Sequence, residues 1–70
     1  MTDQHQQWVE NNMLLFTTSR RYTDEEYRMI FEIVSNVTNT PTKVTRCGRC
    51  VTNAKNTILH HYYEKTRNNN

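Results

Sequence analysis

The sequence predicts an all-α fold, a helical hairpin of two main helices preceded by an N-terminal arm or short helix. Three observations predict it. A helix-capping motif begins at Thr23, apolar residues recur with helical spacing in two separate stretches, and no stretch alternates as a strand does. We therefore expect an arm over residues 1–22, a hairpin domain over 23–66 and a polar tail over 67–70.

The first hairpin helix is expected from Thr23 to about Thr38. Thr23 and Glu26 have the spacing of a capping box, in which each side chain bonds the other residue's amide. One apolar face follows at helical spacing, formed by Tyr27, Ile30, Phe31, Val34 and Val37. Met29 and Ile33 are expected on the opposite side as a second patch. A helix that is apolar on two sides packs between two neighbours, here the last helix and either the arm or another protein.

The second hairpin helix is expected after a break at Asn39 and Pro41, with Thr45 as its N-cap. One stripe of this helix should face the first: Cys47, Cys50, Val51, Ala54, Ile58, His61 and Tyr62. In this interpretation Cys47 and Cys50 are small hydrophobic side chains packed between the helices.

The arm contains more apolar residues than the core of so small a domain is expected to bury. Only 34% of the 70 residues are hydrophobic, and such a core supplies about 3–5 kcal/mol of net stability. A short helix from Asp3 to Asn12, capped by Thr2, is expected, followed by an apolar anchor. We expect a larger protein or a second copy to bind the side chains left over, which are Trp8, Met13, Leu14, Leu15, Phe16, Met29 and Ile33.

Cys47 and Cys50 form the chain's single CxxC motif, for which two hypotheses, a zinc site and thiol chemistry, stand beside simple packing or a small disulfide. Structural zinc needs four ligands, and His60 lies about 15 Å along the helix from Cys50. Zinc would therefore require His5 or a second chain, as in a zinc-clipped dimer. Thiol chemistry is favoured by the helix start and its arginines, but thioredoxin-like enzymes need a βαβ scaffold. We expect no catalytic residues and no cofactor.

Charge is distributed unevenly along the chain. Residues 1–40 hold three arginines and six acids, whereas residues 41–70 hold six basic residues and one acid. An alternative function is therefore a small DNA- or RNA-binding regulator, with a recognition face of Arg46, Arg49, Asn53, Asn56 and His60. The longest apolar run has four residues, so we expect neither a membrane partner nor a secretory signal.

The segment PTKVTRCGRCV at residues 41–51, followed by Ala54, Ile58 and the pair Tyr62 and Tyr63, carries a resemblance. Over residues 23–64 the chain resembles small single-CxxC helical accessory proteins of tailed phages, including crAss-like phages of Bacteroidales. The resemblance implies a non-enzymatic virion protein, assembled in the host cytoplasm and bound to a capsid, portal or head–tail connector. It implies no catalytic residues.

Overall fold

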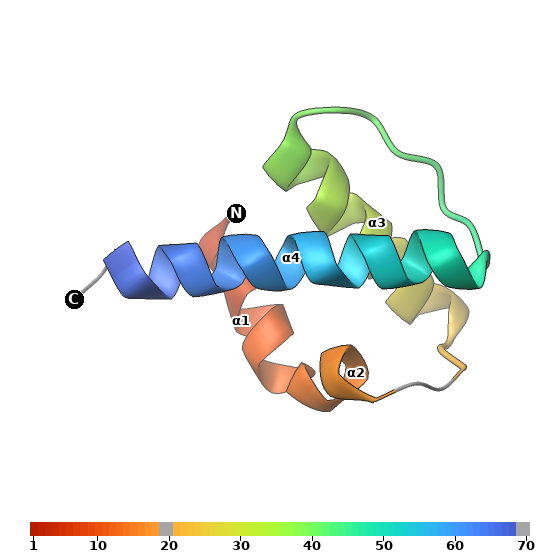
Figure 1. Ribbon diagram of the computed structural model, residues 1–70, viewed down its shortest axis with the longest axis horizontal. Coiled ribbons are helices and arrows are strands. Elements are labelled where there is room, and N and C mark those ends of the chain that lie inside the picture. The colour runs from red at the N-terminus through yellow and green to blue at the C-terminus, as the bar shows by residue number, and fades with distance from the viewer. Residues whose placement is uncertain (19–20, 69–70) are drawn as a thin grey trace.

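The computed structural model describes residues 1–18 and 21–68, in which every regular element is a helix. The helices are α1 (Asp3–Asn11), α2 (Met13–Thr17), α3 (Asp24–Thr38) and α4 (Gly48–Asn68). Figure 1 shows α4 lying across the other three helices, with a long connection from the end of α3 to its start. The expected all-α fold, with two main helices and a short N-terminal helix, is confirmed.

Helix α3 begins and ends where the sequence predicts. The Thr23 hydroxyl accepts from the Glu26 amide at 3.1 Å, and the Glu26 carboxylate accepts from the Thr23 amide at 2.8 Å. At the other end Asn39 has a φ of 54°, a left-handed conformation that asparagine tolerates well, and its amide bonds the Ser35 carbonyl. These bonds join residues close in sequence, so the caps form without help from the rest of the fold.

Helix α1 is also capped as expected, and it turns directly into α2. The Thr2 hydroxyl accepts from the His5 amide at 3.1 Å. At the end of α1, the Asn12 side-chain amide donates to the Trp8 carbonyl at 2.8 Å, and α2 begins at the next residue. This sharp turn folds the apolar run of the arm back onto the hairpin.

The arm is part of the core. The core consists of Val9, Leu15, Phe16, Ile30, Phe31, Ile33, Val34, Val51, Ala54 and Ile58. Leu15 and Phe16 are therefore not available to a partner, which corrects the expectation that they anchor one. Trp8 and Met13 pack partly buried against the same core, and the Trp8 ring meets Phe16 edge-on at 6.1 Å.

Ile33 is a second correction, because it is fully buried in the chain's own core. At 3.6 residues per turn it lies only about 60° around α3 from Ile30, at the margin of the main apolar face rather than opposite it. Met29 lies further around the helix and is half-buried. Of the side chains expected to bind a partner, Leu14 alone is largely exposed, at 75%.

Polar contacts hold the C-terminal half of α4 against α1. The Tyr62 hydroxyl donates to the Glu10 carboxylate at 3.2 Å, and the Lys65 ammonium donates to Asp3 at 3.1 Å. Helix α4 continues to Asn68, beyond the expected start of the polar tail at residue 67, and residues 69–70 lie outside the described part. These contacts join the arm to the hairpin as one unit.

Leu14 and Leu15 give a direct test of the packing of the arm. Leu15 is 1% exposed and Leu14 is 75% exposed. We expect Leu15→Ala to lower the free energy of unfolding by about 2–5 kcal/mol, because it leaves a cavity in the core. Leu14→Ala, the matched control, should change it by less than about 0.5 kcal/mol. Urea unfolding followed by circular dichroism measures both, and equal effects would contradict the buried arm.

Tyr62 gives a test at alkaline pH. Burial, and then the negative charge of Glu10, raise the pKa of the Tyr62 phenol above its ordinary value of 10.0. The folded state thus holds this proton more tightly than the unfolded chain does. The resulting stability is present below about pH 10 and is lost as the pH rises through the folded-state pKa.

We expect Tyr62→Phe to weaken the loss of stability above pH 10, since the variant has no phenol to ionise at this position. Urea unfolding at a series of alkaline pH values measures the slope. The matched control is Tyr63→Phe, which removes a phenol that is 51% exposed at the same end of α4. Equal changes of slope in the two variants would show that the environment of Tyr62 is not responsible.

Candidate functional site

Helix α4 begins two residues later than the sequence predicts. Gly48 is its first residue, and the Cys47 carbonyl accepts the first helical bond, from the Val51 amide at 2.9 Å. Thr45, the expected N-cap, instead accepts a bond from the Cys47 amide at 3.2 Å through its hydroxyl. Cys47 is therefore the last residue before the helix, and Cys50 is the third residue within it.

Both cysteines are exposed, which corrects the expectation that they pack between the hairpin helices. The α3 side of this turn is occupied by Arg46, whose guanidinium pairs with Asp24 and lies 5.5 Å from the centre of the Tyr27 ring. The buried stripe of α4 starts with Val51. The thiols consequently remain on the solvent side of the first turn.

The two thiols influence each other's acidity. The Cys50 thiol, followed by the backbone amides of Cys50 and Arg49, bonds the Cys47 sulfur and lowers the pKa of the Cys47 thiol. The same contact between the thiols raises the pKa of the Cys50 thiol. Cys47 thus holds the position in which a helix-capping side chain receives amide hydrogens, and its thiolate is the favoured one of the pair.

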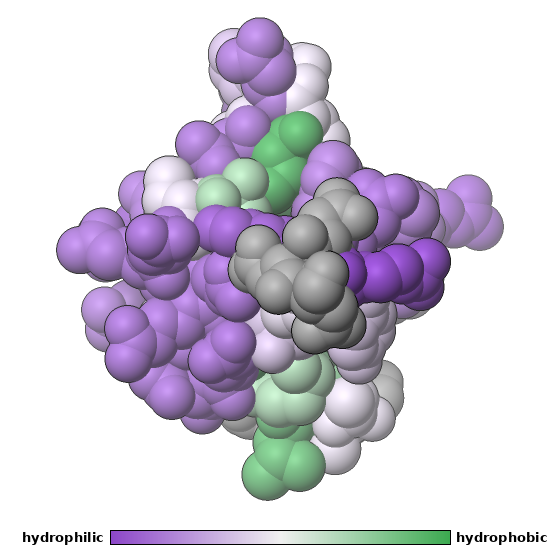
Figure 2. All heavy atoms as spheres, turned by 90° about the vertical axis from the view of Figure 1, so that its left-hand side faces the viewer, coloured by the Kyte–Doolittle hydropathy of each residue, from purple (hydrophilic) through white to green (hydrophobic). Residues whose placement is uncertain are grey.

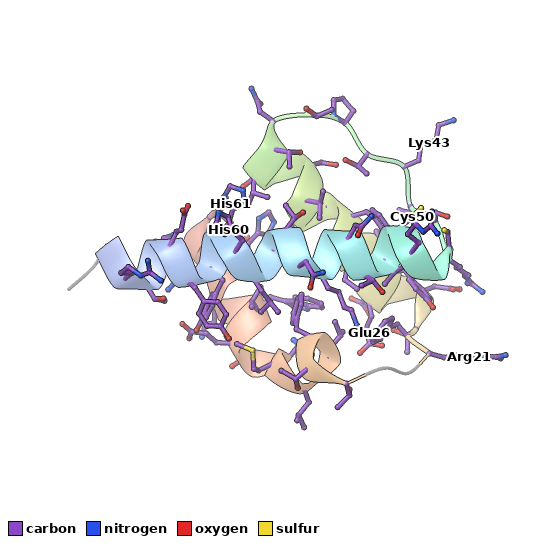
Figure 3. The ribbon with its side chains drawn as sticks, viewed as in Figure 1. Arg21, Glu26, Lys43, Cys50, His60 and His61 are labelled. Carbon is purple, nitrogen blue, oxygen red and sulfur yellow. The ribbon has the colours of Figure 1, made fainter. Side chains whose placement is uncertain are left out.

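The structure does not assemble a metal site within the described residues, where no group of three histidine, cysteine or acidic side chains could hold an ion. Figure 3 shows Cys50 at one end of α4 and His60 and His61 well along the helix from it. His5 contacts α3 instead, because its Nε2 lies 3.5 Å from the Glu32 carboxylate. The ligands that one chain would need to complete a zinc site with the cysteines are therefore not brought together.

One face of α4 points to solvent along its length. We call it the outer face, and its exposed residues are Arg49, Asn53, Asn56, His60, Tyr63 and Arg67. His60 pairs with Glu64 at 3.3 Å, and Glu64 is the one acid of α4. Four of the five residues expected to contact nucleic acid lie on this face, namely Arg49, Asn53, Asn56 and His60. Arg46 does not, because it turns toward Asp24 on α3.

A small polar pocket beside the start of α4 has no signal in the sequence. It has a volume of about 120 Å³, and its walls include Tyr22, Arg46 and Lys55. The Lys55 ammonium donates to the Tyr22 hydroxyl at 2.7 Å, and that hydroxyl donates to the Leu15 carbonyl at 3.0 Å. Lys55 therefore fastens α4 to the end of the arm instead of joining the outer face.

Apolar surface is scattered. The large exposed hydrophobic side chains of the described residues are Leu14 on α2, Val44 in the connection before α4 and Tyr63 on α4. Figure 2, which faces the end where α4 finishes, is mostly hydrophilic, with hydrophobic surface in separate small areas. In the part of the chain that is described, the outer face of α4 is thus the most coherent candidate binding surface.

Comparison with protein-family models, curated proteins and solved structures found no match for this chain. The resemblance to phage accessory proteins therefore rests on the motif residues alone. Among the described helices, none combines the length and the apolar character needed to cross a bilayer.

Proposed function

We propose that this chain is a non-enzymatic accessory protein that binds a larger assembly through the outer face of α4. The observation that carries the proposal is the division of side chains between the core and this face. The arm and the hairpin close one core within a single chain, so the apolar run of the arm is used internally. What remains for a partner is an exposed helical face with arginine and tyrosine, the residue types that dominate binding energy at protein interfaces.

The assembly we propose is a phage virion, in which the chain binds capsid, portal or head–tail connector proteins. The CxxC segment and the residues after it in α4 support this choice by their resemblance to tailed-phage accessory proteins. The role of the arm differs from our expectation, because it stabilises the folded unit, and Leu14 is the exposed one among the large hydrophobic side chains described in it. We therefore assign partner binding to Arg49 and Tyr63 in place of the arm.

This proposal predicts that the chain is incorporated into particles and that incorporation depends on the outer face. Arg49→Ala combined with Tyr63→Ala should lower the copy number per particle at least several-fold, because both side chains are exposed there. Quantitative mass spectrometry of purified particles, from a phage whose genome carries this sequence, measures the copy number.

The matched control is Arg28→Ala, which removes an exposed arginine of α3 that pairs with Glu25 at 4.0 Å. This variant should be incorporated like the unchanged chain. Circular dichroism of each variant confirms that the helices form. Absence of the unchanged chain from particles would refute the virion assignment, and normal incorporation of the double variant would refute the outer face as its interface.

A second candidate function is nucleic-acid binding, favoured by the composition of the same face. Arginine and asparagine are side chains that read base edges in a major groove. At 1.5 Å per residue α4 is about 30 Å long, which is ample for a helix lying in that groove. Against this, Arg46 is paired with Asp24 and adds no free positive charge.

Salt dependence distinguishes this candidate. If the outer face binds phosphates, the affinity for a short fluorescent DNA duplex should fall steeply with added salt. Arg49→Ala should weaken binding and reduce the salt slope by about 1, because one phosphate contact is lost. Fluorescence anisotropy measures the binding, with Arg28→Ala as the control. Absence of binding at low salt would eliminate this candidate and leave the protein-binding one standing.

A further inference from the structure

We propose that Cys47 and Cys50 form a redox-active dithiol that exchanges with an anionic disulfide. This inference is independent of the proposed function, since it uses the first turn of α4 and needs no assembly partner. It rests on the position of the two sulfurs, their exposure and the charge beside them.

The two sulfurs are adjacent and accessible. Cys47 directly precedes α4 and Cys50 is the third residue of the helix, so both side chains start from its first turn, and contact between the two thiols shifts the pKa of each. Both residues are exposed. Gly48 adds to the access, because a Cβ placed on it would meet nothing within 4 Å. A disulfide-bearing molecule can therefore approach the pair without displacing other parts of the chain.

The roles of the two thiols follow from their positions. Cys47 stands immediately before α4, where the unpaired amides and the positive end of the helix dipole stabilise a thiolate, and hydrogen bonding lowers the pKa of its thiol, so Cys47 is the attacking group. Cys50 lies within the helix, and the contact with the Cys47 thiol, followed by burial, raises the pKa of the Cys50 thiol, so Cys50 keeps its proton. Cys50 is therefore the resolving thiol, which acts after Cys47 has reacted.

The reaction balances without a further oxidant. The Cys47 thiolate attacks one sulfur of a disulfide R–S–S–R, whose S–S bond breaks and releases one R–S⁻, which takes a proton from water. Cys50 then loses its proton and attacks the Cys47 sulfur, which forms the Cys47–Cys50 bond and releases the second R–S⁻. Two electrons pass from the pair to the disulfide, and two R–SH are formed.

Positive charge selects the substrate class. Arg49 lies between the two cysteines, is exposed, and makes no ion pair with any residue that the structure describes. The start of α4 adds the positive end of the helix dipole. Together they favour disulfides with carboxylates close to the sulfurs over neutral ones of similar size, and oxidised glutathione is a suitable probe.

The test uses the purified, reduced full chain and oxidised glutathione near neutral pH, followed by intact-mass spectrometry. The unchanged chain should lose the mass of two hydrogens and keep no glutathione. Cys50→Ser should stop at a mixed disulfide with glutathione on Cys47. Cys47→Ser should form an adduct several-fold more slowly, and its rate should rise only at higher pH than that of Cys50→Ser.

Two comparisons complete the test. Arg49→Gln should slow the reaction with oxidised glutathione several-fold more than the reaction with neutral hydroxyethyl disulfide, whereas Arg28→Gln should alter neither rate. Equal adduct rates in Cys47→Ser and Cys50→Ser would overturn the assigned roles. A lasting glutathione adduct on the unchanged chain, or binding of added zinc that protects the thiols from oxidised glutathione, would overturn the dithiol itself.

Discussion

Helix α3 has an apolar face too wide for a single neighbour to cover. Phe31 lies near one margin of this face and Ile33 at the other, about 160° apart around the helix, and both are buried. A face of that width needs two packing partners. Helix α4 supplies one and the arm supplies the other, so the position of the arm follows from the sequence of α3. Val9, Leu15 and Phe16 of the arm share one core with Ile33, and burial of an isoleucine side chain contributes about 1.5–3 kcal/mol.

The basic residues of the C-terminal half lie in two different environments. Arg46 and Lys65 pair with acids of α3 and α1, and in doing so they fasten the two ends of α4 to the rest of the molecule. Exposed pairs of this kind contribute little energy each, so packing of Val51, Ala54 and Ile58 in the core is what mainly holds α4 in place. Arg49 and Arg67 point away from these acids and stay available for a partner. The basic residues at and within α4 therefore either pair with acids of other helices or stay exposed, according to the side they occupy.

The sequence alone predicted the helix ends correctly where the hydrogen bonds that cap them join residues close in the sequence. Thr23 with Glu26, and Asn39 at the end of α3, involve neighbours within four residues, so the motif determines the geometry. The predicted start of α4 was two residues too early, because Arg46 contacts α3 instead of joining the helix. Its partner Asp24 lies 22 residues away in the sequence. No periodic pattern records such a contact, and the exposure of the cysteines depends on it.

The burial of the arm was missed for a related reason. Counting apolar residues suggested a core too small to use them all, whereas the turn at Asn12 places Leu15 and Leu14 in opposite environments. For the candidate site the pattern was more informative. Arg49, Asn53 and His60 share a face because helical spacing alone puts them there, and only Arg46 was redirected by a tertiary contact.

Arg49 is where the two proposals meet. It belongs to the outer face of α4, and it also stands between Cys47 and Cys50 in the first turn. The buried part of the helix begins at Val51, so a bond between the cysteines changes the first turn without entering the core. Oxidation would thus change the surroundings of Arg49, which we propose as a partner-binding residue, while the core stays intact. A binding measurement on the oxidised and reduced chains therefore tests whether the chemistry at the start of α4 is coupled to its outer face.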